Sequence, residues 1–518
     1  MKPLMLVASL STCLLAACSM EPTYQRPAMP VPNRYPQGNT LPANATAPSS
    51  PAAQAASAPS ATAHASVADL QWRDFFRDPA LQRLIDIALE NNRDLRIAAA
   101  NMAQARAGYG VARSSLFPEI DLQGYAGRQR LPGMTQQPSN GLLGPIQNNR
   151  NTASSFNTFQ VQAGMTNYEL DFFGKQRATV RESGKLAEAS AADYQAARIA
   201  VIGEVANAYL SLNADRALLQ LAQQTLAAQQ QHADVMQKAY RDGGVSEFDM
   251  RRSQTQVSTA QVDVEDVQTR IAKDINAMSV LIGQPLPASY ATPSLWQAPL
   301  LTDVPAGLPS TLLDRRPDIV AAEDRLRAAN ADIGRARAAF FPNIALTAAL
   351  GALSGGLSHL FTAGSLAWNA GASASMPLLD WGRNKNELSA SKARYTGATA
   401  AYEGTVQQAF REVADALAVR DHIVPELKAQ QDLVDQSQHV YAISQVRFKE
   451  GMDDYIATQD AQRSLYAAQQ KLVGLELDQA VNQVNLYKAL GGGWNGVANR
   501  PASVAQATPA PSPTAGAL

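Results

Sequence analysis

The side chains best suited to covalent chemistry in this 518-residue chain are its two cysteines, Cys13 and Cys18. Lys2 and an apolar stretch from Leu4 to Leu15 lead into the run Leu-Ala-Ala-Cys, which closes at Cys18. This layout is typical of a secretory signal peptide over residues 1–17. The run also resembles a bacterial lipobox, in which lipid is attached to the cysteine sulfur and the new amino terminus is acylated, enough acyl chains for stable anchoring. We therefore predict that Cys18 is lipidated, with an ordinary signal peptide as the alternative.

The sequence gives little support for metal binding, catalysis or nucleic-acid binding. The histidines are not grouped at metal-ligand spacing, and no nucleophile, base and orienting partner can be assembled. Lys plus Arg number 44 and Asp plus Glu 45, so the net charge of −1 gives no basic field for nucleic acid. We predict no enzymatic activity, no cofactor, no metal and no nucleic-acid partner. The five histidines are His64, His232, His359, His422 and His439.

An internal repeat organises the chain. Asp94–Pro118 matches Asp318–Pro342 at an offset of 224 residues (318 minus 94), and Gly174–Gly283 matches Gly382–Gly491 at an offset of 208 (382 minus 174). The smaller second offset means that the first copy contains a longer loop between its two matched parts. The chain is therefore a tandem duplication.

This repeat and the composition of the two ends divide the chain into six segments. The ends are rich in Pro, Ala, Ser and Thr and cannot form a core. The predicted segments are a signal peptide (1–17), a lipidated amino terminus and leader (18–66), a first repeat (67–290), a linker (291–311), a second repeat (312–494) and a disordered tail (495–518).

Each repeat contains a stretch in which apolar residues alternate with polar or very small ones. Phe159–Met165 and Trp368–Met376 both follow a period of two, which suits a transmembrane strand with lipid on one side and water on the other. Ile120–Leu122 and Ile344–Leu350 supply partner strands. Four strands cannot enclose a channel, so several chains must share one barrel. Two surface hairpins on a soluble domain are the alternative.

Long helices occupy most of the remaining sequence. Only 17% of residues are charged and 6% aromatic, which disfavours a bulky globular core. Lys175–Tyr240 lacks proline and Arg383–Phe448 contains only Pro425, so each can form a helix of about 66 residues, on the order of 100 Å long. Apolar residues recur every seven positions in both, as in coiled coils. Shorter helices are predicted over Leu81–Leu116, Ser246–Leu281, Leu312–Phe340 and Asp454–Leu490.

Several runs resemble a known family. They are Arg315–Ile319 with Ala321–Glu323, Ala328–Gly334, Ala338–Pro342, Asp460–Leu465 and Val484–Trp494. Between about Leu70 and Trp494 the chain resembles the outer-membrane factors of bacterial efflux systems, in the lipidated OprM-like branch of the TolC superfamily. The resemblance implies an α+β membrane protein, a trimer whose chains give four strands each to a 12-stranded β-barrel that continues as a coiled-coil α-helical barrel.

The resemblance also implies a gate at the periplasmic end. It assigns Ile456 to an apolar plug, Asp460 to an acidic ring and Arg463 to the adjoining basic group. Their spacing of i, i+4 and i+7 independently places them on one helix face. Three copies of Asp460 around one axis would repel one another and favour cation entry. The alternative is a solvated Asp–Arg pair contributing a few tenths of a kcal/mol.

The function implied is that of an outer-membrane exit duct. Glycine-containing turns end the long helical hairpins, and we expect them to dock a periplasmic membrane-fusion adaptor linked to an inner-membrane RND-type pump. Localisation in the outer membrane, with extension into the periplasm, follows. A type I secretion duct and a non-conducting periplasmic coiled-coil tether are the alternatives. The predicted docking residues are Arg241, Asp242, Gly243, Lys449, Glu450 and Gly451.

Overall fold

The computed structural model describes residues 20–32, 35, 71–131, 154–287, 290, 313 and 315–494. The predicted signal peptide, Cys18, most of the leader, the linker 291–311 and the tail 495–518 lie outside these residues. The described helices are α3 (Trp72–Phe75), α4 (Pro79–Asn91), α5 (Arg93–Ser114), α6 (Lys175–Arg241), α7 (Glu247–Ile282), α8 (Pro317–Ala338), the 3-10 helix η3 (Leu357–His359), α9 (Arg383–Lys449) and α10 (Tyr455–Ala489). The strands are β1 (Asp121–Leu131), β2 (Ser154–Leu170), β3 (Asn343–Ser354) and β4 (Leu366–Ser375).

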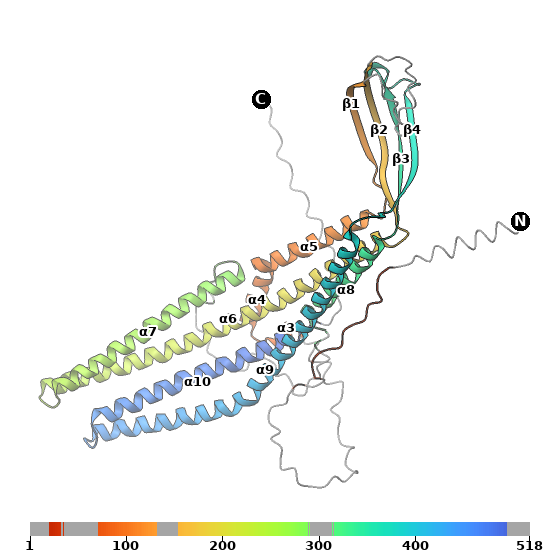
Figure 1. The fold of residues 1–518 in the computed structure, drawn as a ribbon. Helices are drawn as coiled ribbons and strands as arrows, with labels where there is room; N and C mark the ends of the chain where they lie inside the picture. The colour runs from red at the N-terminus through yellow and green to blue at the C-terminus, as the bar shows by residue number, and fades with distance from the viewer. Residues whose placement is uncertain are drawn as a thin grey trace, which may run out of the picture. The chain divides into compact units, whose positions relative to one another are not determined.

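The described parts of the chain form two compact units (Figure 1). The first takes its described residues from the ranges 1–29, 99–191 and 321–404, and the second takes its described residues from 30–98, 192–320 and 405–518. Each unit takes residues from both copies of the repeat. One copy of the repeat therefore does not form one compact unit. Each compact unit combines the matching parts of both copies.

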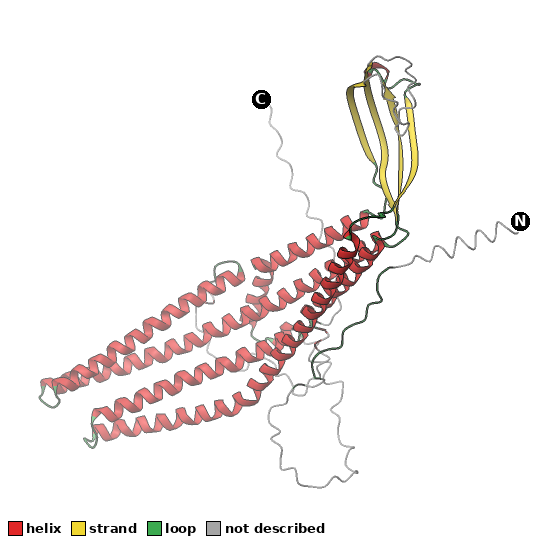
Figure 2. Ribbon diagram, viewed as in Figure 1, coloured by secondary structure: helices red, strands yellow, loops and turns green. Residues whose placement is uncertain are grey.

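The first unit contains a single antiparallel sheet in the order β1-β2-β3-β4, drawn in yellow in Figure 2. Its register sorts the side chains by face, because Leu122 pairs with Ala163, Ala163 with Leu350, and Leu350 with Trp368. Trp368 is 72% exposed on this apolar face. The opposite face carries Gln123, Gln160, Gln162, Asn343, Thr347, Asn369 and Ser373. One face therefore suits lipid and the other suits water.

The second unit contains the part of each long helical hairpin that includes its turn, one hairpin formed by α6 and α7 and the other by α9 and α10. The helices α6 and α9 each run for 67 residues, and α9 continues through Pro425. Between α9 and α10, Val434 packs against Leu465 and Ala468 in an apolar cluster. These helices end within one residue of the predicted boundaries.

A buried arginine joins three helices in the second unit. The side chain of Arg316 is 9% exposed and forms an ion pair with Asp318 at 2.7 Å and another with Glu412, on α9, at 2.9 Å. Its Nη1 also donates to the carbonyl of Ala489, at the end of α10, at 2.9 Å. Since a buried guanidinium needs several acceptors, these contacts explain why the sequence places an arginine before Pro317 and an aspartate after it.

One predicted helix is interrupted. Leu81–Leu116 forms two helices, α4 and α5, because Asn92 leaves the helical conformation between them. The Oδ1 of Asn92 accepts from the backbone N–H of Leu95 at 2.9 Å, and its Nδ2 donates to the carbonyl of Leu281 at 2.8 Å. Asparagine at a helix start satisfies an otherwise unpaired donor. The second contact ties this break to the end of α7.

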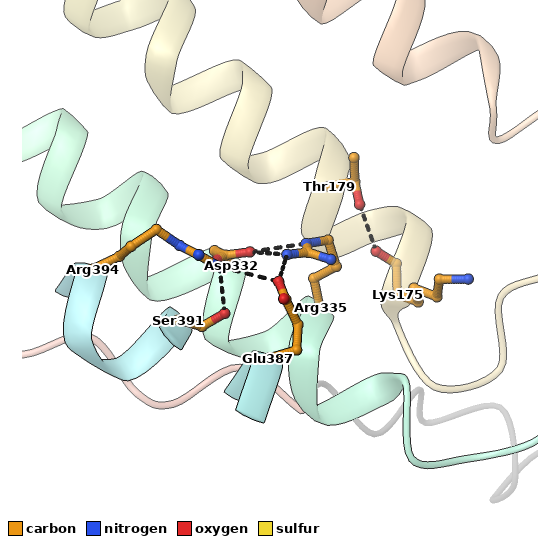
Figure 3. A network of polar contacts seen from close by, with 7 residues as sticks. All are labelled: Lys175, Thr179, Asp332, Arg335, Glu387, Ser391 and Arg394. Carbon is orange, nitrogen blue, oxygen red and sulfur yellow. Dashed lines mark hydrogen bonds and ion pairs between the residues drawn. The ribbon is translucent and has the colours of Figure 1, made fainter. Parts of the chain in front are cut away.

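A polar network connects α8 to α9 in the first unit (Figure 3). The Asp332 side chain is 5% exposed and forms ion pairs with Arg335 at 2.5 Å and with Arg394 at 2.7 Å. Arg394 also donates to Ser391 at 2.8 Å, and Glu387 accepts from Arg335 at 3.1 Å. Burial alone would raise the pKa of Asp332, but hydrogen bonds from Arg394, Ser391 and Arg335 bring it below its ordinary value of 3.8.

We expect Asp332→Ala to lower the free energy of unfolding by about 1 to 3 kcal/mol, because it removes the buried carboxylate that accepts from Arg335 and Arg394 and leaves only the more exposed Glu387 to pair with them. Because the pKa of Asp332 is lowered on folding, its contribution is present at neutral pH and is lost as the pH falls through that pKa. Denaturant titration of the detergent-solubilised protein measures the change. The control is Glu188→Ala, which removes a pair whose carboxylate is mostly exposed and should cost about 0 to 1 kcal/mol. Equal losses in both variants would contradict the assignment.

Candidate functional site

The described segment that follows the predicted lipidation site is fixed along α8. Arg337 donates to the carbonyl of Met20 at 3.3 Å, and Arg181 pairs with Glu21 at 2.6 Å. Asn330 donates to both Glu21 (3.1 Å) and the carbonyl of Pro22 (2.9 Å). Met20 therefore lies beside the last turn of α8, and only four residues separate the end of that helix from the start of β3.

The contacts continue along the same helix. Tyr24 donates to Glu323 at 3.3 Å, and Arg26 forms an ion pair with Glu323 at 3.1 Å. The guanidinium of Arg327 lies over the Tyr24 ring at 5.2 Å. These contacts were not predicted from the sequence. The feature of the sequence that could have indicated these contacts is the mixture of charged and aromatic residues directly before the Pro- and Ala-rich leader.

A close approach explains one glycine of the repeat. A Cβ on Gly334 would lie 3.0 Å from the Cα of Glu21. At the matching position in the first copy, Gly110, no atom lies within 4 Å of where a Cβ would be. Only the second copy therefore uses its glycine to admit the amino-terminal segment.

Both predicted docking turns are exposed and lie at the same end of the second unit (Figure 1). Gly243 and Gly451 have φ angles of 74° and 69°. No atom lies within 4 Å of the position that a Cβ would take at either glycine, so space is not the reason for glycine here. The left-handed backbone of the turn favours it instead. Beside Gly451, Arg447 makes two hydrogen bonds to Asp453, of 2.6 and 2.9 Å.

The three predicted gate residues lie on α10, directly after the second turn. Asp454 precedes the helix and accepts from the backbone N–H of Ala457 at 3.2 Å. Ile456 is 38% exposed, and Arg463 donates to Asp460, both largely exposed within the single chain. The structure thus brings Asp460 and Arg463 together, with Ile456 one turn earlier on the same helix.

Polar residues also join the two hairpins near these turns. Gln229 on α6 donates to Gln462 on α10 at 2.9 Å. His232 on α6 stacks on Tyr455, the first residue of α10, with ring centroids 3.8 Å apart. The sequence gives no sign of these contacts, since His232 is recognisable there only as a histidine without metal-ligand neighbours.

Neither a membrane-spanning helix nor a metal site is present among the described residues. No helix there is both long and apolar enough to cross a membrane. Within the same residues, no three His, Cys, Asp or Glu side chains are grouped so that they could hold a metal ion.

Comparisons with known proteins agree with this architecture. The chain matches the family described as outer membrane efflux protein over residues 84–284 and 308–492. It is 39% identical over 504 residues to the probable efflux pump outer membrane protein TtgC of Pseudomonas putida strain KT2440, covering 96% of this chain and 98% of that protein. A crystal structure of a membrane protein from Pseudomonas aeruginosa gives a TM-score of 0.81 at 35% identity, covering 92% and 98%. The open state of the Neisseria gonorrhoeae MtrE outer membrane channel gives 0.73 at 31% identity, covering 92% and 99%.

A sheet with one apolar and one polar face, together with long antiparallel helical hairpins, defines an outer-membrane channel of the TolC-like fold. The chain belongs to the outer membrane efflux protein family. It is a component of an efflux pump, in the outer membrane and extending into the periplasm. The predicted resemblance, fold class and efflux function are confirmed, and so is the prediction that the chain is not an enzyme, since the family consists of channels.

Proposed function

We propose that this channel is the passive exit duct of a tripartite pump, a homotrimer that docks a periplasmic adaptor linked to an inner-membrane RND-type pump. The observation that carries the proposal is the pair of exposed hairpin turns, one from each repeat, with the candidate gate residues beginning five positions after Gly451. An adaptor that binds these turns can act directly on the first turn of α10. Docking and gate opening are thereby coupled.

The sheet supports the trimer. In the described sheet β1 and β4 are edge strands, and unpaired backbone groups facing lipid are costly. Three copies joined edge to edge supply twelve strands and satisfy these groups.

The relatives support a substrate class. Proteins of Pseudomonas putida that are 39% identical to this chain are described as outer membrane proteins of antibiotic, toluene and solvent efflux pumps. Small apolar or amphiphilic molecules are therefore the proposed cargo. A water-filled duct with a polar inner face adds little selectivity, so the choice among such molecules is left to the pump.

Docking predicts two outcomes at the second turn. Gly451→Pro should abolish efflux in cells while trimers persist on native gels, because proline cannot adopt the positive φ of this position. A photo-crosslinking residue at Lys449 should capture the adaptor in cells that assemble the pump. The matched control is Lys428, an exposed position within α9, which should capture none. Absence of adaptor crosslinks at Lys449 in a working pump refutes tip docking.

The gate predicts a change in resting current. Asp460→Ala removes the acidic ring and its pair with Arg463, and should loosen the closed state by about 1 to 3 kcal/mol if three partly desolvated charge-assisted bonds weaken together. Resting conductance in a planar bilayer should rise and cation preference should fall. Recordings of wild type, Asp460→Ala and Arg463→Ala at two salt concentrations test this. Identical current and selectivity in all three assign the pair to a solvated surface.

From the run Leu-Ala-Ala-Cys we predict that Cys18 is lipidated. The contacts of Met20 and Glu21 with α8 support an anchor beside the point where the chain enters β3. Intact-mass measurement of the membrane-extracted protein should show a chain that begins at an acylated Cys18. Cys18→Ser should lose the acyl mass, whereas Cys13→Ser should leave the mature mass unchanged. A wild-type chain without acyl groups would falsify the assignment.

A further inference from the structure

An aromatic cluster links the two hairpins next to the candidate gate. His232 on α6 stacks on Tyr455 with ring centroids 3.8 Å apart and an interplanar angle of 16°. Phe448, near the end of α9, forms a T-shaped pair with His232, with ring centroids 5.9 Å apart, and its centroid lies 5.6 Å from that of Tyr455. All three residues belong to the second unit. Because Tyr455 is the first residue of α10, this cluster fixes the start of the helix that carries Ile456 and Asp460.

The ring of His232 occupies a site built for a neutral imidazole. It is half-buried, and its Nε2 is buried with no hydrogen-bond partner among the described residues. Tyr455 is 6% exposed. A neutral ring can leave one nitrogen unpaired at modest cost, whereas an imidazolium has two N–H donors that both need acceptors.

We propose that His232 is a positioning residue for the gate helix: its neutral ring, stacked on Tyr455, holds the first turn of α10 against α6, and protonation of the ring releases that turn. The inference rests on the proposed gate at Ile456 and Asp460. It adds an acid-sensitive contact to a gate otherwise attributed to docking.

The electrostatic surroundings agree with this role. Burial lowers the pKa of His232 to about 4, and no described carboxylate contributes to the shift. The ionisable groups acting on Tyr455 are Tyr441 on α9 and the positive Arg252 on α7. Neither group stabilises a neighbouring imidazolium as a carboxylate would. Stacking on Tyr455 gives a protonated ring some cation–π attraction, but the net lowering of the pKa shows that desolvation is the larger effect.

The sign of the pH effect follows from the two pKa values. Well above its ordinary pKa of 6.5, His232 is neutral whether packed or released. Between pH 6.5 and about 4 the released ring binds a proton and the packed ring does not, so acid favours release. From pH 7.5 to 4.5 this linkage shifts the equilibrium toward release by roughly 70-fold.

The test uses the full-length lipidated trimer in two measurements. In the first, spin labels at Arg241→Cys and Lys449→Cys report the distance between the two turns, in trimers mixed so that one chain carries labels. In the second, planar bilayers report resting conductance. Both are recorded at pH 7.5 and 4.5 for wild type, His232→Phe, His232→Leu and His439→Phe. His439 is an exposed histidine of α9 and makes the matched control.

For wild type and His439→Phe we expect the distance distribution to broaden and the resting conductance to rise severalfold at pH 4.5. His232→Phe and His232→Leu keep an apolar contact that cannot be protonated, so both measurements should change much less. The same acid response in wild type and in both His232 variants overturns the inference. A response in distance that depends on His232, with conductance that does not, shows instead that the contact forms but that the gate lies elsewhere. That outcome overturns the gate proposal separately.

Discussion

The requirement that every backbone polar group in lipid be hydrogen bonded is the constraint on which the rest of this structure depends. The chain contributes four strands with one apolar face, and each interior strand is paired on both sides. In the described sheet, the outer edges of β1 and β4 are not paired with another strand. A chain with this sheet alone leaves two strand edges whose backbone groups lipid cannot satisfy, which is why the proposed trimer joins the sheets edge to edge.

That constraint also explains why the repeat and the compact units differ. Each copy of the duplication supplies one strand hairpin and one long helical hairpin. Strand hairpins from the two copies join in one sheet through the pairing of β2 with β3. Contacts such as that of Gln229 with Gln462 join the helical hairpins in the second unit. The two copies thus supply two strand hairpins and two helical hairpins. The strand hairpins pair with each other, and so do the helical hairpins.

The sequence predicted the parts of this structure that depend on periodicity. Alternation at Trp368–Met376 located β4 to within two residues, and the long proline-poor runs located α6 and α9 to within one, since period and helix breakers are local properties. The first strand hairpin was located less well, because β1 extends to Leu131, nine residues beyond the predicted Leu122. The break at Asn92 was missed because the carbonyl of Leu281 that receives its side chain is distant in sequence. The contacts of Glu21 and of His232 were missed for the same reason. Residues that position the candidate site were therefore less predictable than the elements that carry it.

The chemistry of the interfaces indicates which surfaces can move. Within the second hairpin, α9 and α10 pack through apolar side chains including Val434 and Leu465, whose separation would expose them to water. Between the hairpins, the contact includes an amide pair and a histidine–tyrosine stack, and Oε1 of Gln229 is buried with no partner among the described residues. Water can replace hydrogen bonds of this kind at little net cost. Each hairpin should then move as a rigid body, with the rearrangement taking place between the hairpins, at the interface that holds the first turn of α10.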